Sequence, residues 1–405
     1  MRGWNLTNTM GRHRICRYVL RNKILWRRLY AVFASMSFLM YFFGHPAFGL
    51  EKLFYIPCGL ALFSSIFCRF KLDGVDMLLC LMVILAVASA VINRNLTLDF
   101  TSPTIRFILG ILCFNPLRKS DKEMIVRQIC VWSLPVIIGF FLIEIPFVYL
   151  HRYLGYTGDP NYLAIGLTIL TAINMYGICL YHQNIWMKAG SMLVLTGAFL
   201  IVLATMSRIG LIGMLCLYQC FFYGLLKNRI GRRPAIFLIL MTSIVMVALL
   251  VWYAGDYPFY RFSMDDKSGL VSIFSRVDQV WGVLRYFSVN LADIFLGIGF
   301  DAEAVHIPEY GLYARHCVHN TFFCSLFHSG ILGFVAFVLF VGYAVKCVHA
   351  QTQLRTIGVG LLIALILNMN SIPSLTSLLF WWGFFFVMSD VGHLVANKPT
   401  PLQVR

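Results

Sequence analysis

Apolar segments of membrane-spanning length follow one another through almost the whole sequence. A transmembrane helix needs about 20 consecutive, mostly apolar residues, and twelve segments reach or approach that length. Charged residues make up only 12% of the chain and the mean hydropathy is +0.78, which is typical of polytopic membrane proteins. We therefore predict an all-α polytopic membrane protein with about twelve transmembrane helices. The expected segments are Tyr30–Gly44, Leu50–Phe67, Val75–Ile92, Thr104–Leu117, Ile129–Leu150, Asn161–Tyr181, Ile185–Thr205, Ile209–Leu226, Pro234–Ala254, His319–Val345, Thr356–Asn370 and Pro373–Met388.

The distribution of Lys and Arg predicts the orientation of these helices, because basic residues collect in short loops on the cytoplasmic side of a membrane. Eight Lys or Arg precede Tyr30, and alternation of twelve helices puts the basic gaps 69–71, 118–122, 227–233 and 346–355 on the same side. The opposite side receives a long loop, 256–318, with five Lys or Arg against eight Asp or Glu. Both termini are therefore expected in the cytoplasm.

This topology divides the chain into five expected parts. A basic cytoplasmic tail (1–29) leads into helices one to nine (30–254), and a large outer loop (255–318) precedes helices ten to twelve (319–389) and a cytoplasmic tail (390–405). The net charge of +16 does not indicate nucleic-acid binding, since the basic residues lie in short gaps between apolar segments. Most of the twelve cysteines lie inside apolar segments as small hydrophobic residues, and none has the spacing of a metal site.

Three polar residues from separate parts of the sequence are expected to meet at the outer face. Arg208 begins the eighth helix, Arg276 lies in the outer loop, and His319 begins the tenth helix. An arginine at a membrane boundary is commonly an interface anchor. A guanidinium at a helix start is also suited to hold a phosphate or diphosphate, so both interpretations of Arg208 stay open.

The outer loop also carries the pattern of an amphipathic helix that lies on the membrane surface. Apolar residues at 273, 274, 277, 280, 281 and 284 follow helical spacing. Arg276 and Arg285 would then lie at the interface, either facing a substrate or as ordinary surface arginines near Asp278.

His319 is a candidate general base, because an imidazole accepts a proton near neutral pH. Its neighbour Asn320 would help to position it at the start of an apolar helix. The alternative is a structural histidine, which is the interpretation given to His328 nearby. A metal site built from His316 and His319 lacks carboxylate or thiolate partners at ligand spacing, so no metal is expected.

The loop before the sixth helix contains Arg152 and ends in Gly-Asp-Pro-Asn161. These are turn residues, so a turn that caps the next helix is the simplest explanation. Contacts of Arg152 and Asn161 with a substrate are the alternative. The segment Leu296-Gly-Ile-Gly299 is too short for a nucleotide-binding fingerprint and follows no β-α pattern.

In their order, spacing and sidedness, these motifs resemble the O-antigen ligase family, part of the ligase and polymerase superfamily of bacterial surface polysaccharide assembly. The resemblance covers residues 150–340 by motif and the whole chain by topology. The motifs that carry it are Ser207-Arg208 with Gly210, Ser275-Arg276 with Trp281, Leu296-Gly-Ile-Gly299, His319-Asn320 with Gly330 and Gly333, and Pro160-Asn161-Tyr162-Leu163-Ala164.

The resemblance implies a metal-independent, inverting glycosyltransferase of the C type (GT-C), without a cofactor, in the inner membrane of a Gram-negative bacterium. Such an enzyme moves a glycan from undecaprenyl pyrophosphate to a sugar hydroxyl of the lipid A core on the periplasmic side, which completes lipopolysaccharide. Carried onto this sequence, Arg208 and Arg276 match the family's essential arginines and His319 its essential histidine. Arg152, Asn161, Arg285 and Asn320 are expected substrate contacts.

Two other functions remain open at the level of the sequence. An O-antigen polymerase would use a second carrier-linked repeat unit as its acceptor, and no residue in the sequence distinguishes it from a ligase. A transporter of an anionic lipid-linked sugar is the other alternative, but such proteins tend to show internal repeats and ionisable groups near the membrane midplane. No internal repeat stands out here, and the notable charges are expected at one face.

Overall fold

The computed structural model describes residues 24–43, 53–68, 72–94, 96, 102–148, 159–181, 183–205, 207–252, 267–300, 320–351, 354–370 and 374–389. These residues form helices and short turns, with no strand among them. The first helix covers residues 24–40. It is followed by η1 (Tyr41–Phe43), α2 (Tyr55–Cys68), α3 (Gly74–Ile92), α4 (Pro103–Phe114), η4 (Asn115–Lys119), α5 (Lys122–Val148), α6 (Pro160–Leu180), α7 (Ile185–Ala204), α8 (Arg208–Ile230), α9 (Arg232–Trp252), α10 (Lys267–Val289), α11 (Asp293–Leu296), α12 (Thr321–Ala350), α13 (Arg355–Met369), η9 (Ser374–Thr376) and α14 (Leu378–Met388).

Each of the twelve predicted apolar segments overlaps a helix of this structure. Among the described residues, six helices are both long and apolar enough to cross a bilayer, namely α3, α5, α6, α7, α8 and α12. The shorter helices α2, α13 and α14 are apolar as well. An all-α multi-pass membrane protein is therefore confirmed, while the number of spans and the GT-C arrangement stay predictions.

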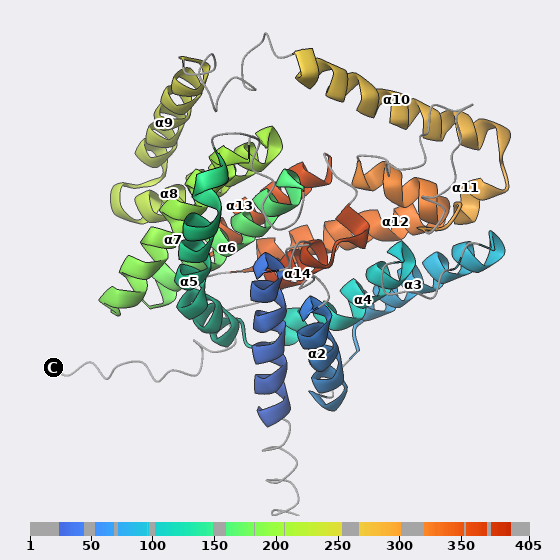
Figure 1. Cartoon of the computed structure of the whole chain (residues 1–405), viewed down its shortest axis with the longest axis horizontal. Coiled ribbons are helices and arrows are strands. Elements are labelled where there is room, and N and C mark those ends of the chain that lie inside the picture. The colour runs from blue at the N-terminus through green and yellow to red at the C-terminus, as the bar shows by residue number, and fades with distance from the viewer. Residues whose placement is uncertain are drawn as a thin grey trace, which may run out of the picture.

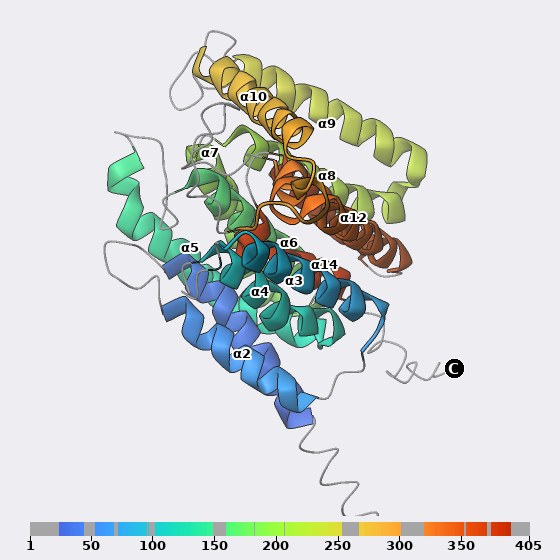
Figure 2. The same cartoon turned by 90° about the vertical axis from the view of Figure 1, so that its right-hand side faces the viewer.

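Two helices form the centre of the molecule, α6 and α14 (Figures 1 and 2). Every residue of α14 is buried, as are nearly all residues between Leu163 and Ile178 in α6. A helix that is apolar all round is expected in such a place. At 11 residues, α14 is about 16 Å long, which is shorter than a bilayer core, but a helix enclosed by others need not match the membrane. Its Trp382 ring stacks on Phe38 at 4.4 Å between centroids and donates its indole N–H to the carbonyl of Ala34 at 3.0 Å.

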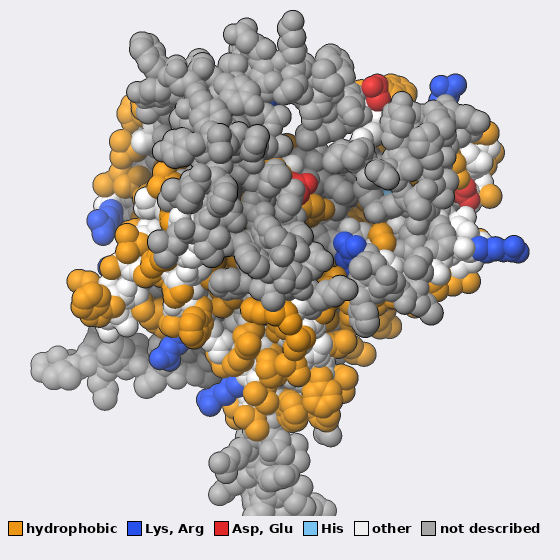
Figure 3. Space-filling view, viewed as in Figure 1, with side chains coloured by type: hydrophobic (Ala, Val, Ile, Leu, Met, Phe, Trp, Pro, Cys, Tyr) orange, Lys and Arg blue, Asp and Glu red, His pale blue; other side chains and the backbone are white. Residues whose placement is uncertain are grey.

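The periphery of the helix bundle is apolar too. Large hydrophobic side chains are exposed along α2, α3, α8 and α9, and Figure 3 shows them covering the described surface around α2, broken by a few Lys or Arg. A soluble protein rarely exposes so much contiguous apolar surface. Lipid tails would cover it in a membrane.

Small residues bring α8 and α13 close together. A β-carbon at Gly213 would lie 3.2 Å from Cβ of Ala364, and one at Gly224 would lie 2.3 Å from Oγ1 of Thr356. Small side chains at such contacts are typical of helix pairs in membranes, where close backbone approach replaces the hydrophobic effect. The two contacts also show that α8 and α13 are antiparallel, so α8 begins beside the end of α13.

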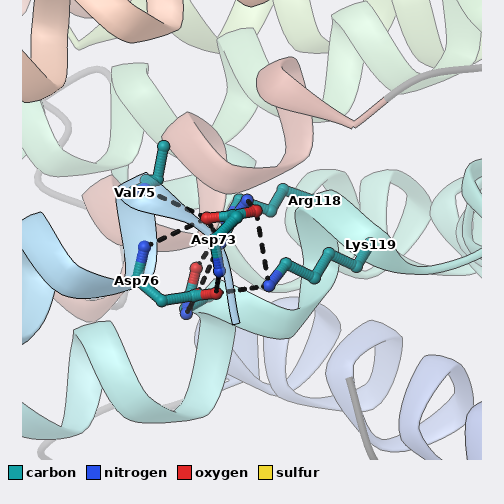
Figure 4. Close-up of polar contacts among 6 residues, drawn as sticks. Asp73, Val75, Asp76, Arg118 and Lys119 are labelled. Atoms are coloured by element: carbon teal, nitrogen blue, oxygen red, sulfur yellow. Dashed lines mark hydrogen bonds and ion pairs between the residues drawn. The ribbon is translucent and has the colours of Figure 1, made fainter. Parts of the chain in front are cut away.

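An ion cluster ties the start of α3 to η4 (Figure 4). Arg118 pairs with both Asp73 and Asp76, and Lys119 pairs with the same two carboxylates. Asp73 caps α3, and Asp76 accepts a hydrogen bond from the Asp73 backbone N–H at 2.7 Å, which completes a capping box. Burial alone would raise the pKa of the Asp73 carboxyl, but hydrogen bonds and charge from Arg118 and Lys119 hold it below its usual range.

The cap of α14 is built by side chains from two other helices. The buried ammonium of Lys122, at the start of α5, donates to the carbonyl of Ser389 at 3.1 Å and lies 4.2 Å from the ring centroid of Tyr176. The amide of Gln351 donates to the carbonyls of Val387 and Ser389. A helix end leaves carbonyls without intrahelical partners, and a cation there also interacts favourably with the helix dipole.

Candidate active site

Helices α6 and α8 begin side by side and are joined by a hydrogen bond. Asp159 caps α6 by accepting from the backbone N–H of Asn161 at 2.7 Å. Ser207 caps α8 by accepting from the N–H of Gly210 at 3.2 Å. The Ser207 hydroxyl in turn donates to Oδ1 of Asn161 at 2.7 Å. We refer to Asp159–Asn161 and Ser207–Arg208 as the helix-start cluster.

The approach of these two helices requires a glycine. Gly210 faces Ala164 of α6, and a β-carbon at position 210 would lie 2.4 Å from the Ala164 β-carbon. Since real β-carbons do not approach so closely, Gly210 sets the distance between the two helix starts. Arg208 is the first residue of α8 and half-buried, so its position is fixed by the same contact. The first N–H groups of a helix and its dipole favour an anion at this point.

Helix α12 begins at the same end of the bundle. Asn320 caps it by accepting from the N–H groups of Phe322 and Phe323, and its amide donates to Oδ1 of Asn370 at 3.2 Å. Asn370 ends α13. Two residues earlier, Asn368 lies against Gly213 of α8, so α13 connects the start of α12 to the helix-start cluster.

The first part of α12 is held by a second loop. The helix is broken at Gly330, which has φ +65° and ψ −171°. There the N–H of Ile298 donates to the carbonyl of Phe327 and the N–H of Gly299 donates to the carbonyl of His328, each at 3.0 Å. A β-carbon at Gly330 would lie 2.4 Å from the carbonyl carbon of Phe295. Non-helical backbone at membrane depth is tolerated only where other groups of the protein form hydrogen bonds with its N–H and C=O groups. The loop with Ile298 and Gly299 supplies these hydrogen bonds at the break of α12.

Residues 192–338 match the family model described as O-antigen ligase. This match supports an assignment of the chain to the O-antigen ligase family. A search of curated proteins finds no match. The matched segment runs from α7 into α12 and therefore contains Arg208, Arg276 and the start of α12. Similarity to this family model suggests an enzyme of O-antigen ligation or of the related polymerisation.

Within this O-antigen ligase segment, the structure positions only some of the predicted site residues. Arg208 lies in the helix-start cluster with Asn161, which is outside the family match, and Asn320 begins α12. Arg152 and His319 lie outside the described residues, as does the side chain of Arg276.

Helix α10 confirms the predicted helix around Arg276 and Arg285. Val283 and Phe287 are buried, and the Phe287 ring lies 6.1 Å from Phe327 of α12. Position 276 precedes them by seven and eleven residues, the spacing of one helix face, so this position is on the face that packs on α12. Arg285 follows position 276 by nine residues, which places it about half a turn around the helix axis, on the opposite face. It is exposed.

Three residues of the apolar stripe predicted for α10 lie on its exposed side, while Val280 is half-buried. Val277, Trp281 and Leu284 are all exposed, whereas the buried face consists of other residues. Such a face suits a membrane surface, and that placement of α10 stays a prediction.

His328, the histidine interpreted as structural from the sequence, is buried in the junction of α12 and the Leu296–Gly299 loop. Its Nδ1 lies 2.7 Å from the carbonyl oxygen of Gly299, and its ring stacks on Phe300 at 5.2 Å. Sequence reasoning missed the supporting roles of Ser207, Asn370 and this loop. The backbone at positions 297, 299 and 330 has a positive φ, which favours glycine. The three glycines are therefore a visible signal in the sequence, but the sequence does not show which groups contact this loop.

In the part of the chain that the structure describes, no group of three His, Cys, Asp or Glu side chains is arranged to hold a metal ion. The polar atoms of the helix-start cluster are hydroxyl, amide and carboxylate oxygens together with one guanidinium. The oxygens cap and join the two helix starts, and the guanidinium is of the type that can pair with an anion.

Proposed function

We propose that this protein transfers O-antigen, or a related surface glycan, from undecaprenyl pyrophosphate to the lipid A-core oligosaccharide at the periplasmic face of the inner membrane. The observation that carries the proposal is the helix-start cluster. It presents Arg208 at the first position of α8, beside the start of α6 and within the segment that matches the O-antigen ligase family.

In the proposed reaction, the oxygen of an acceptor hydroxyl forms a bond to the anomeric carbon of the glycan. The bond from that carbon to the diphosphate breaks, and the configuration inverts because attack and departure occur on opposite faces. His319 takes the proton of the hydroxyl, and undecaprenyl pyrophosphate leaves with the electron pair. Arg208 and Arg276 stabilise its growing negative charge, so the reaction requires no metal ion.

The geometry supports Arg208 in this role. A guanidinium fork matches phosphate oxygens, and the N–H groups at the start of α8 add donors that need no reorganisation. By its helical spacing from Val283 and Phe287, position 276 belongs to the face of α10 that packs on α12. His319 directly precedes the capped start of α12.

The same observations separate the expected substrate contacts. Asn161 accepts from Ser207, so its role is to position the start of α8 as much as to bind substrate. Asn320 holds the start of α12 through its cap and its bond to Asn370. Arg285 is on the exposed side of α10 and is the weakest of these expectations. The proposed contact of Arg152 with the substrate is supported only by the resemblance to the family.

The test is a ligation assay with purified protein, carrier-linked glycan and a core acceptor. Arg208→Ala, Arg276→Ala and His319→Ala should each reduce the rate about a hundredfold or more, since one contact to developing charge is worth roughly 3 kcal/mol. Arg285→Ala tests the weakest expected contact, and because this side chain is exposed on α10, the rate should stay within about threefold of the parent rate. Addition of a metal chelator should leave the rate unchanged.

Comparable activity of the three variants and the parent, at equal abundance in membranes, would refute the assigned roles. Joining of two carrier-linked repeats without use of the core acceptor would instead identify a polymerase. Glycan uptake without product would identify a transporter, a class in which broken helices such as α12 are common.

A further inference from the structure

A groove of about 680 Å³ lies between α7, α8 and α9, away from the helix-start cluster. Its walls are apolar and aromatic, and Phe222, Leu225 and Leu238 are among its exposed side chains. The floor is tied together by two hydrogen bonds of 2.7 Å. Tyr218 donates to the carbonyl of Leu195 in α7, and Gln219 donates to the hydroxyl of Ser243 in α9.

One end of the groove carries a charge. Arg229, in the last turn of α8, is the charged residue of its lining. Lys227, Arg232 and Arg233 adjoin it at the turn from α8 to α9, and no Asp or Glu occurs anywhere between Asp159 and Asp256. The four helices α6 to α9 therefore contain no carboxylate that could pair with these basic residues, which we call the basic corner. A complementary partner must bring negative charge from outside these helices.

The length of the groove fits one lipid chain. The lining runs along α8 from Leu215 to Arg229, a separation of fourteen residues or about 21 Å at the rise of an α-helix. Half of a bilayer core is about 15 Å thick, so an acyl chain beside Leu215 and Tyr218 would place its headgroup at the level of Arg229. The hydroxyls of Thr196 and Thr242 donate to carbonyls of their own helices, which leaves the wall apolar.

We infer that this groove binds an anionic phospholipid of the leaflet that contains the α8–α9 turn. One acyl chain lies between α7, α8 and α9, and the phosphate contacts Arg229. The site is separate from the proposed glycosyl transfer, because Arg208 lies at the opposite end of α8, 21 residues from Arg229.

The probe is phosphatidylglycerol with a photoreactive group on one acyl chain, in phosphatidylcholine vesicles that contain the full-length protein. Crosslinks should fall on lining residues between Leu215 and Thr242, and phosphatidylcholine with the same group should give about fivefold fewer. Arg229→Gln should lower the phosphatidylglycerol yield about fivefold, since one basic residue near an anionic surface is worth on the order of 1 kcal/mol. Arg232→Gln, which removes the same charge from the same corner outside the groove lining, should change it less than twofold.

A second pair of variants tests the chain site. Leu238→Trp should fill the groove and reduce crosslinking, while Ile244→Trp, at an exposed α9 position outside the lining, should not. Equal yields for the two phospholipids, equal effects of Arg229→Gln and Arg232→Gln, or crosslinks outside α7–α9 would each overturn the inference. Displacement by undecaprenyl phosphate but not by unlabelled phosphatidylglycerol would also overturn it, because the groove would then hold the carrier lipid. Ligation activity is not part of these readouts, so the inference can fail independently of the proposed function.

Discussion

Arg208 owes its position to its neighbours, above all to Ser207. One hydroxyl caps α8 through Gly210 and also donates to Asn161 at the start of α6. Both helix starts therefore depend on one side chain. A guanidinium aimed at a diphosphate is effective only if its position is fixed before the reaction, so Ser207 should matter for catalysis without contacting the substrate.

We expect Ser207→Ala to lower the free energy of unfolding by about 1–2 kcal/mol, because it removes an N-cap and takes a hydrogen-bond donor away from the amide oxygen of the half-buried Asn161. In the ligation assay, kcat should fall more than KM rises. Ser207→Thr keeps the hydroxyl and should restore most of the rate. Thermal unfolding in detergent and steady-state kinetics measure the two effects, and a Ser207→Ala protein with parental kcat would show that Arg208 is positioned by other contacts.

The residues recognised from the sequence are those with local signals. Asp159-Pro160-Asn161 and Ser207-Arg208 stand at helix starts, where turn residues and caps leave a readable pattern. Asn370 could not be found in this way, because its partner Asn320 is 50 positions away. The contact of Ser89 with the carbonyl of His328 spans 239 positions and leaves no local trace.

At the scale of elements, hydropathy predicted the tenth helix but not its break. The expected segment His319–Val345 corresponds to α12, yet Gly330 interrupts the helix with a positive φ. Hydropathy does not detect this change in backbone conformation, because a glycine among apolar residues leaves the mean hydropathy of the segment high. For residues 358–388, which Asn368, Asn370 and Pro373 interrupt, the sequence left open two helices or one long irregular helix. The structure has two, α13 and α14.

We expect Gly330→Ala to abolish folding or to reduce abundance in membranes strongly. A methyl group at position 330 would lie 2.4 Å from the backbone of Phe295, and its φ of +65° is unfavourable for any side chain. Gly342→Ala in the same helix is the matched control, because no atom lies within 4 Å of a β-carbon there. Quantification of folded protein by size-exclusion profiles compares the two, and similar profiles would mean that the loop 296–299 does not need this close contact.

The ion cluster of α3 and η4 predicts a dependence of stability on pH. The pKa of Asp73 is lower in the folded protein than its usual value of about 4, so its ion pairs with Arg118 and Lys119 stabilise the fold above that value. The stabilisation is lost as the pH falls below about 4. Thermal midpoints in detergent should be constant from about pH 5 to 8 and fall below about pH 4. Asp73→Asn should have a lower midpoint at neutral pH and a smaller acid-induced decrease, whereas an equal decrease would assign the effect to other carboxyl groups.

At the scale of the whole molecule, composition alone predicted the class. An apolar content of 60% requires a protein whose exterior as well as its core is apolar, and the exposed residues of α3, α8 and α9 are of that kind. Composition could not predict which helices would be enclosed. The sequence of α14 shows only that it is apolar on every side, and its central place results from packing against α4, α6, α12 and α13.

The predicted orientation depends on the difference in charge between the loops assigned to the two sides of the membrane. Two exposed positions can test it. Ile230 ends α8 beside four Lys or Arg, while Leu291 follows α10 in a loop with more acidic than basic residues. Only α9 separates them as an expected span, because α10 contains four charged residues and has one face packed on α12. Basic residues are retained inside, so the two positions should lie on opposite sides of the membrane.

The test uses single cysteines in a variant that lacks the twelve native ones. The ten cysteines that the structure describes are free thiols, so their replacement breaks no disulfide among them. Leu291→Cys should react with a membrane-impermeant maleimide in spheroplasts, and Ile230→Cys only after permeabilisation, with the permeant reagent as the control for reactivity. Reaction of both positions from the same side would mean that α10 crosses the membrane or that α9 does not. Leu291 would then lie on the side of the α8–α9 turn, opposite Arg208 at the start of α8, and the proposed periplasmic site would fail.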